Sequence, residues 1–115
     1  MDTLVVIDQP PYSDWRGRES LDIGFALAAF DQNVSLFFTG PGVYWLLDGQ
    51  NGEALGQKTL TRQLSAAPMF GIEQLLFDQE ACRKAGLDAA SLIDQAQPAD
   101  EPVALYRRYH HVITL

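Results

Sequence analysis

The chain has 115 residues, of which 47% are hydrophobic and 20% charged, and its formal net charge at pH 7 is -7. These values are typical of an ordinary globular protein, and we expect a single domain over residues 1–115. The negative charge repels phosphate backbones and argues against direct nucleic-acid binding, while no apolar run is long enough to span a membrane.

The first half of the chain alternates between strand and helix patterns. Residues 3–8 are a continuous apolar run with β-branched side chains, which predicts a buried parallel strand ending at two prolines. A helix is expected from Glu19 onward, because Leu21 and Phe25 recur at helical spacing. Residues 34–40 predict a second buried strand, and the Pro-Gly pair after it begins a short helix.

The second half continues the alternation. A third helix is expected from residue 55 and ends at Pro68, and a third strand covers residues 72–78. The remaining predicted elements are a helical segment at 79–86 with a glycine C-cap, a weak strand at 90–97, a short helix within 98–110 and a final strand at 111–115. We therefore predict an α/β fold, a three-layer α/β/α sandwich with a mostly parallel five-stranded sheet.

Acidic residues follow several of the predicted strands. Open parallel sheets bind ligands beyond the carboxyl ends of their strands, where Asp8 and Asp78 lie and where Asp94 is a candidate for closing a third strand. Phosphoacceptor receiver domains hold Mg²⁺ with such carboxylates, but the paired acid after the first strand and the lysine after the last are missing here. We interpret these aspartates as caps where strand meets helix.

Other ligand sites have weak support in the sequence. A flavin mononucleotide site is disfavoured because Pro10 and Pro11 have no N–H to donate to a phosphate. The Gly-Pro-Gly of residues 40–42 could hold an anion at a helix N-terminus, but such a segment is more often a tight turn. His110 and His111 face opposite ways on a strand and have no third ligand in sequence. We expect neither a metal nor a cofactor.

Cys82 is the only cysteine and the candidate nucleophile or sulfur carrier. A reactive thiol needs solvent access and a lowered pKa. Cys82 comes four residues after Asp78, at the end of the first turn of the predicted helix, where the helix dipole stabilises a thiolate only weakly. The charge of nearby Glu80 disfavours a thiolate, whereas the charges of Arg83 and Lys84 favour one. A free cysteine usually packs as a small hydrophobe, so catalysis by Cys82 is kept as the alternative.

The cellular location is expected to be the cytoplasm. The chain starts with an acid at position 2 and lacks the basic region of a secretory signal. One cysteine also excludes an internal disulfide framework or a multi-cysteine metal site.

Two groups of residues are candidates for protein contacts. Arg16 and Arg18 belong to a predicted loop near the ligand-binding edge, where they could bind an anion or pair with acids of a neighbouring subunit. Trp15, Tyr44 and Trp45 are aromatic and could form subunit contacts, because aromatics are enriched in interface cores. The competing interpretation is that they fill the core of this domain.

Four segments together resemble one known family: GRESLD, LFFTGPGVYWLLDGQ, GIEQLLFDQEACRKAGLD and the final HHVITL. In order and spacing, over nearly the whole chain, they are similar to the TusC/DsrF family. This resemblance implies the DsrE/DsrF/DsrH-like fold, a parallel five-stranded α/β sandwich. It also implies a heterohexamer with TusB-like and TusD-like subunits. That complex relays persulfide sulfur from a TusA-like toward a TusE-like carrier, for 2-thiolation of the wobble uridine of certain tRNAs.

The same resemblance implies that this subunit is not catalytic. The sulfur-accepting cysteine resides on the TusD/DsrE subunit, at a position that corresponds approximately to Asp78 here. An aspartate cannot carry a persulfide, and Cys82 lies one helical turn downstream. Three alternatives stay open: a DsrF-like subunit of a DsrEFH complex in dissimilatory sulfur oxidation, a sulfurtransferase using Cys82 itself, and a stand-alone homo-oligomer that binds a small anion.

Overall fold

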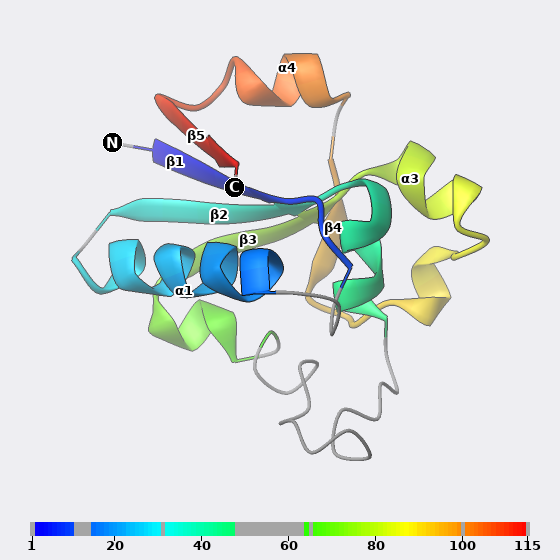
Figure 1. Cartoon of the computed structure of the whole chain (residues 1–115), viewed down its shortest axis with the longest axis horizontal. Helices are drawn as coiled ribbons and strands as arrows, with labels where there is room; N and C mark the ends of the chain where they lie inside the picture. Colours follow the sequence, from blue (N-terminus) through cyan, green and yellow to red (C-terminus); the bar gives the residue numbers. More distant parts are fainter. Residues whose placement is uncertain are drawn as a thin grey trace.

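Five strands form one parallel sheet in the order β4-β3-β2-β1-β5 (Figure 1). The computed structural model describes residues 2–10, 15–30, 32–47, 64, 66–99 and 101–114, without the side chains of residues 15–18 and 89. The strands are β1 (Asp2–Ile7), β2 (Asn33–Phe38), β3 (Ile72–Phe77), β4 (Ala96–Pro98) and β5 (His111–Thr114). The predicted α/β class and five-stranded parallel sheet are confirmed.

Helices cover both faces of this sheet. The α-helices are α1 (Trp15–Ala29), α3 (Gln79–Lys84) and α4 (Pro102–Tyr106), and the 3₁₀ helices are η1 (Gly40–Leu46), η3 (Ala67–Phe70) and η4 (Ala89–Ser91). In Figure 1, α1 lies under one face of the sheet and α4 over the other. Within the described ranges, no helix combines the length and the apolar character needed to cross a membrane.

The apolar runs of the central strands are buried because both of their faces are covered. In β1, Val5 and Ile7 pack into the larger core on the α1 face, and Leu4 and Val6 into the smaller core on the α4 face. All four side chains are at most 3% exposed. Burying an aliphatic side chain of this size stabilises a fold by roughly 1.5–3 kcal/mol, which explains why the continuous runs become central strands.

Helix α1 begins at Trp15, four residues before the predicted start at Glu19. The predicted start was wrong because the helical pattern of apolar residues begins only at Leu21, several residues after the backbone has become helical. Arg16 and Arg18 consequently lie in the first two turns of α1 and not in a loop. Their side chains, like that of Trp15, lie outside the described part of the structure.

The predicted strand at residues 90–97 is also wrong over most of its length. Only Ala96–Pro98 pairs with β3, and a 3₁₀ turn occupies the beginning of the predicted strand. The backbone N–H of Ile93 donates to the carbonyl of Leu46 at 2.9 Å, so this segment docks against η1 before the chain reaches the sheet. Asp94 therefore precedes β4 and does not close a strand.

Most of the third predicted helix, residues 55–63, lies outside the described residues. At its expected end, Leu64 is helical, Ala66 is in a turn and Pro68 lies in the first turn of η3. Proline is well tolerated there, because the N–H groups of a first turn have no partner within the helix.

Candidate functional site

Three polar residues lie at the carboxyl edge of the sheet, each directly after a strand. Asp8 follows β1, Thr39 follows β2 and Asp78 follows β3. The ladder extends one step beyond the strands: the N–H of Thr39 donates to the carbonyl of Ile7 at 3.1 Å, and the N–H of Asp78 to that of Phe38 at 2.9 Å. The backbone pairing thus brings residues from distant parts of the sequence to one edge.

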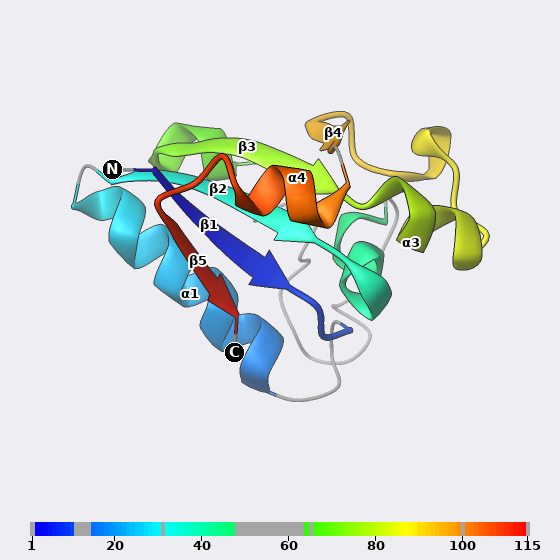
Figure 2. The same ribbon diagram turned by 90° about the horizontal axis from the view of Figure 1, so that it is seen from above.

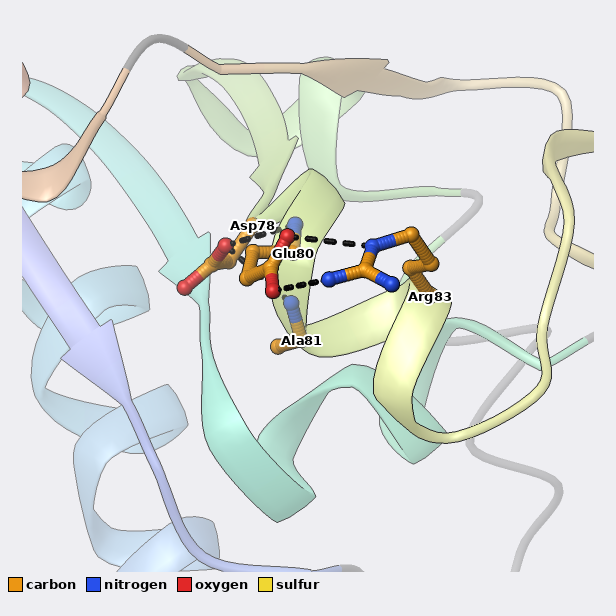
Figure 3. A network of polar contacts seen from close by, with 4 residues as sticks. All are labelled: Asp78, Glu80, Ala81 and Arg83. Atoms are coloured by element: carbon orange, nitrogen blue, oxygen red, sulfur yellow. Dashed lines mark hydrogen bonds and ion pairs between the residues drawn. The ribbon is translucent and has the colours of Figure 1, made fainter.

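The carboxylate of Asp78 is the N-cap of α3 (Figure 3). Its Oδ1 accepts hydrogen bonds from the backbone N–H groups of Glu80 at 3.0 Å and Ala81 at 3.2 Å. Its Oδ2 accepts a hydrogen bond from the Thr39 hydroxyl at 2.7 Å. The cap interpretation is confirmed for Asp78, and the third bond ties the end of β2 to the start of α3.

The negative charge at this edge reaches the α4 face of the sheet. Tyr106, on α4, has its pKa raised by burial and then by the charges of Asp78 and Asp8. Its ring packs edge-on against Phe37, with centroids 6.0 Å apart. Burial and the charges of the two aspartates therefore both disfavour the ionised form of this phenol.

A second polar contact lies at the surface of α3. The guanidinium of Arg83 donates from Nε to Glu80 Oε2 at 3.1 Å, and a second bond links its Nη2 to Glu80 Oε1 (Figure 3). This hydrogen bonding holds the pKa of Glu80 below its usual value. Both side chains are exposed, so the pair contributes little to stability.

An open pocket of about 400 Å³ lies between η1 and α3 beside the Asp78 cap. Its floor includes Thr39 and Asp78, whose polar atoms are already bonded to each other. The other lining residues are Gly40, Pro41, Tyr44, Glu80, Ala81, Lys84 and Ala85. Asp78 accepts three hydrogen bonds, so its carboxylate has a structural role at this edge of the sheet.

Cys82 lies on the buried side of α3. Its side chain is 4% exposed and packs in the larger core, on the α1 face of the sheet. Burial raises the pKa of the thiol, and the charge of Asp78 raises it further. A buried thiol with a raised pKa is a poor nucleophile, because the thiolate is the reactive form.

The predicted aromatic contact residues have different surroundings. Tyr44 is 38% exposed and lines the pocket. Trp45 is only 2% exposed, and its indole N–H donates to the carbonyl of Gln9 at 2.7 Å. Trp45 therefore fills the core of this chain and offers no surface to a partner.

Sequence reasoning missed three strongly exposed apolar side chains. Phe30 at the end of α1 is 79% exposed, and Met69 and Phe70 on η3 are 87% and 62% exposed. The two segments adjoin, since Phe70 packs edge-on against Phe25 of α1 with ring centroids 5.9 Å apart. We call Phe30, Met69 and Phe70 the apolar patch. The sequence feature that could have predicted this exposure is the short Pro-Met-Phe-Gly turn, because so short a segment cannot bury two consecutive large side chains.

The two histidines do not form a metal site with their neighbours. His110 Nδ1 accepts a long bond of 3.4 Å from the backbone N–H of Asp2, and His111 begins β5. Among the described residues, no three His, Cys, Asp or Glu side chains gather closely enough to hold a metal ion.

Comparisons with known proteins agree with this architecture. The model of the DsrE/DsrF-like family matches residues 1–114. A Pseudomonas aeruginosa protein named Protein TusC homolog is 37% identical over 114 residues, covering 97% of this chain and 96% of its own. A Vibrio parahaemolyticus protein of the same name is 32% identical over 87 residues, covering 76% and 74%.

Two solved structures share the fold. The YchN protein from E. coli has a TM-score of 0.82 at 20% identity, with 100% of this chain and 99% of that chain covered. A Methanobacterium thermoautotrophicum protein of unknown function has a TM-score of 0.74 at 14% identity, with 99% and 98% covered. At these identities the likeness establishes the fold alone.

Proposed function

The chain belongs to the DsrE/DsrF-like family, and we propose that it is a non-catalytic subunit of a Tus-type sulfur-relay complex. The relatives named as TusC homologs support this assignment. In the proposed complex the chain assembles with TusB-like and TusD-like subunits in the cytoplasm. The assembly passes persulfide sulfur from a TusA-like toward a TusE-like carrier, for 2-thiolation of the tRNA wobble uridine.

The observation that carries the proposal is the absence of a usable thiol. A sulfur carrier needs an accessible thiolate to accept sulfane sulfur as a persulfide. The chain has one cysteine, and Cys82 is buried with a raised pKa. At the strand end, Asp78 is held by three hydrogen bonds and cannot carry sulfur. The chemistry therefore has to be supplied by another subunit.

The apolar patch supports membership of a complex. Exposed aromatic and methionine side chains are enriched in protein interfaces, and Phe30, Met69 and Phe70 are all more than half exposed. Burial of these side chains against another subunit would remove apolar surface from water. The patch is thus the surface we expect to contact a partner subunit.

The first test is co-expression with TusB-like and TusD-like proteins, followed by gel filtration. We expect the three chains to elute together. Separate elution of this chain would contradict complex membership. A native mass spectrum showing only self-association would instead favour a stand-alone oligomer.

The second test is sulfur relay through the assembled complex, with wild-type protein and with Cys82→Ala. We expect equal transfer of labelled sulfur to the TusE-like carrier in both. A large loss in the variant, with the complex still assembled, would make Cys82 the sulfur acceptor and overturn the non-catalytic role.

The third test separates tRNA thiolation from a DsrF-like role in dissimilatory sulfur oxidation. Removal of the gene from its host should lower the 2-thiouridine content of tRNA. Unchanged thiolation together with an intact complex would exclude the tRNA pathway and favour the DsrF-like alternative.

A further inference from the structure

A short exposed basic segment interrupts this acidic chain. Arg107, Arg108, His110 and His111 are all exposed, and we call them the basic turn. They include both histidines and two of the eight lysine and arginine residues of a chain whose net charge is -7. Residues 102–114 contain no aspartate or glutamate. Arg107 and Arg108 therefore give this part of the surface a local positive charge.

The fold holds the basic turn at the start of β5. Leu105 anchors α4 in the smaller core, and the N–H of Arg108 donates to its carbonyl at 3.0 Å. The N–H of His110 donates to the carbonyl of Asp2 at 3.0 Å, which joins the turn to β1. Figure 2 shows this connection running from α4 back to β5. The side chain of Asp2, at the start of β1, accepts a hydrogen bond from that of Asn33 at 3.0 Å.

Strand β5 is one of the two edge strands of the sheet (Figure 2). It pairs with β1 along one side, and on its other side no strand pairs with it among the described residues. Val112 is in register with Leu4, so its side chain lies on the α4 face, where it is 39% exposed. We call β5 together with the basic turn the β5 border. It combines an open backbone edge, an apolar side chain and adjoining positive charge.

We propose that this border binds an extended acidic segment of a partner protein, which adds to β5 as a further strand. The open edge offers backbone groups that pair with another peptide backbone. Alternate side chains of the added strand fall on the α4 face, where an apolar residue would contact Val112. Acidic residues of the segment would lie against the basic turn.

A nucleic acid fits the same border less well. Phosphates would meet the positive charge, but a nucleic acid has no peptide backbone to continue the sheet, and the whole chain repels it. This inference does not rest on the proposed function, because it uses a different border of the molecule from the Asp78 edge and the apolar patch.

The test is nuclear magnetic resonance of the isotope-labelled full chain, titrated with a capped peptide that alternates glutamate and valine. We expect amide shift changes concentrated at the basic turn and β5. A matched peptide with alternate amides N-methylated keeps its charge but cannot pair as a strand, so we expect it to bind much more weakly. Equal binding of the two peptides would overturn strand addition.

Variants test the charge. Arg107→Ser combined with Arg108→Ser should weaken peptide binding by roughly tenfold, since the two substitutions remove two solvent-exposed charges that would face the acidic peptide. Arg83→Ser, at an exposed arginine on α3, should leave binding unchanged. Well-dispersed spectra of both variants would show that they are folded. Equal weakening by both variants would contradict a local basic site.

Two further outcomes would also contradict the proposal. Oligothymidylate that shifts the same amides as strongly as the acidic peptide would show a general polyanion site. Concentration-dependent shifts along β5 without any peptide would show that a second copy of this chain occupies the edge.

Discussion

Asp78 and Cys82 lie one helical turn apart and have opposite surroundings. The Asp78 carboxylate accepts hydrogen bonds from two backbone N–H groups and from the Thr39 hydroxyl, while the Cys82 thiol is enclosed by the core. A single side chain can cap a helix or carry sulfur, but an aspartate can do only the first. The hydrogen bonds of Asp78 therefore link the end of β2 to the start of α3, and their loss should lower the free energy of unfolding.

Asp78→Ala should lower the free energy of unfolding by about 1–2 kcal/mol, because it removes the N-cap of α3 and the acceptor of the Thr39 hydroxyl. Asp78→Asn should cost less, since an asparagine oxygen also caps a helix. Urea unfolding measures both. Equal stability of the alanine variant and the wild type would contradict the capping role.

Cys82 should make stability fall at alkaline pH. Its pKa is raised in the folded protein by burial and by Asp78, so its contribution is fully present below the unfolded thiol pKa of roughly 8.5. The contribution is lost as pH rises through the folded pKa. As the pH rises above about 8, the wild type should therefore lose more free energy of unfolding than Cys82→Ala.

The raised pKa of Tyr106 also lowers stability at alkaline pH, but it is present in both the wild type and Cys82→Ala. The difference between their pH profiles therefore reports the thiol alone. Urea unfolding at several pH values provides the measurement. Parallel pH profiles for wild type and Cys82→Ala would mean that the thiol titrates alike in the folded and unfolded chains.

At the scale of the elements, η1 packs closely against the end of β1. A Cβ on Gly42 would lie 1.9 Å from the carbonyl oxygen of Ile7, which is a backbone atom at the end of β1. The next helix along this edge, α3, faces η1 across the pocket. The approach of η1 to β1 therefore requires glycine, and it helps to define one wall of the pocket.

Gly42→Ala should destabilise the protein by at least about 2 kcal/mol, because either η1 or β1 must move to relieve the clash. Gly40→Ala is the matched control: its φ of +52° strains a side chain, but nothing lies within 4 Å of the added Cβ. That strain should cost about 1 kcal/mol. Thermal unfolding compares the two, and a smaller loss for Gly42→Ala would contradict the close approach.

On the scale of the whole molecule, the two faces and the borders of the sheet differ in what they expose. The α1 face carries the larger core, and the apolar patch lies on α1 and η3. The basic turn lies instead beside β5. The two proposed contact surfaces thus lie on different parts of this chain.

Phe30→Glu combined with Met69→Glu should prevent assembly with the TusB-like and TusD-like subunits. Both side chains are largely exposed, so the free energy of unfolding of the isolated chain should change by less than about 1 kcal/mol. Val103→Glu, at a residue of α4 that is 64% exposed, is the control and should still assemble. Gel filtration after co-expression decides the outcome, and assembly of the double variant would exclude the patch as the interface.

The sequence by itself determined the class of fold and the Asp78 cap. Continuous apolar runs become central strands because only a sheet covered on both faces buries them, and alternation with helices makes the pairing parallel. An aspartate between a strand and a helix caps the helix through groups two and three residues away. Both inferences depend on short-range patterns, which a sequence displays directly.

Tertiary structure alone decided which side chains face water. Trp45 and Cys82 are buried, whereas Phe30 and Met69 are exposed, although all four are apolar residues on or beside helices. The bond between Thr39 and Asp78 joins residues that only the pairing of β2 with β3 brings together. Burial and long-range contacts depend on which elements oppose one another, and local periodicity carries no information about that arrangement.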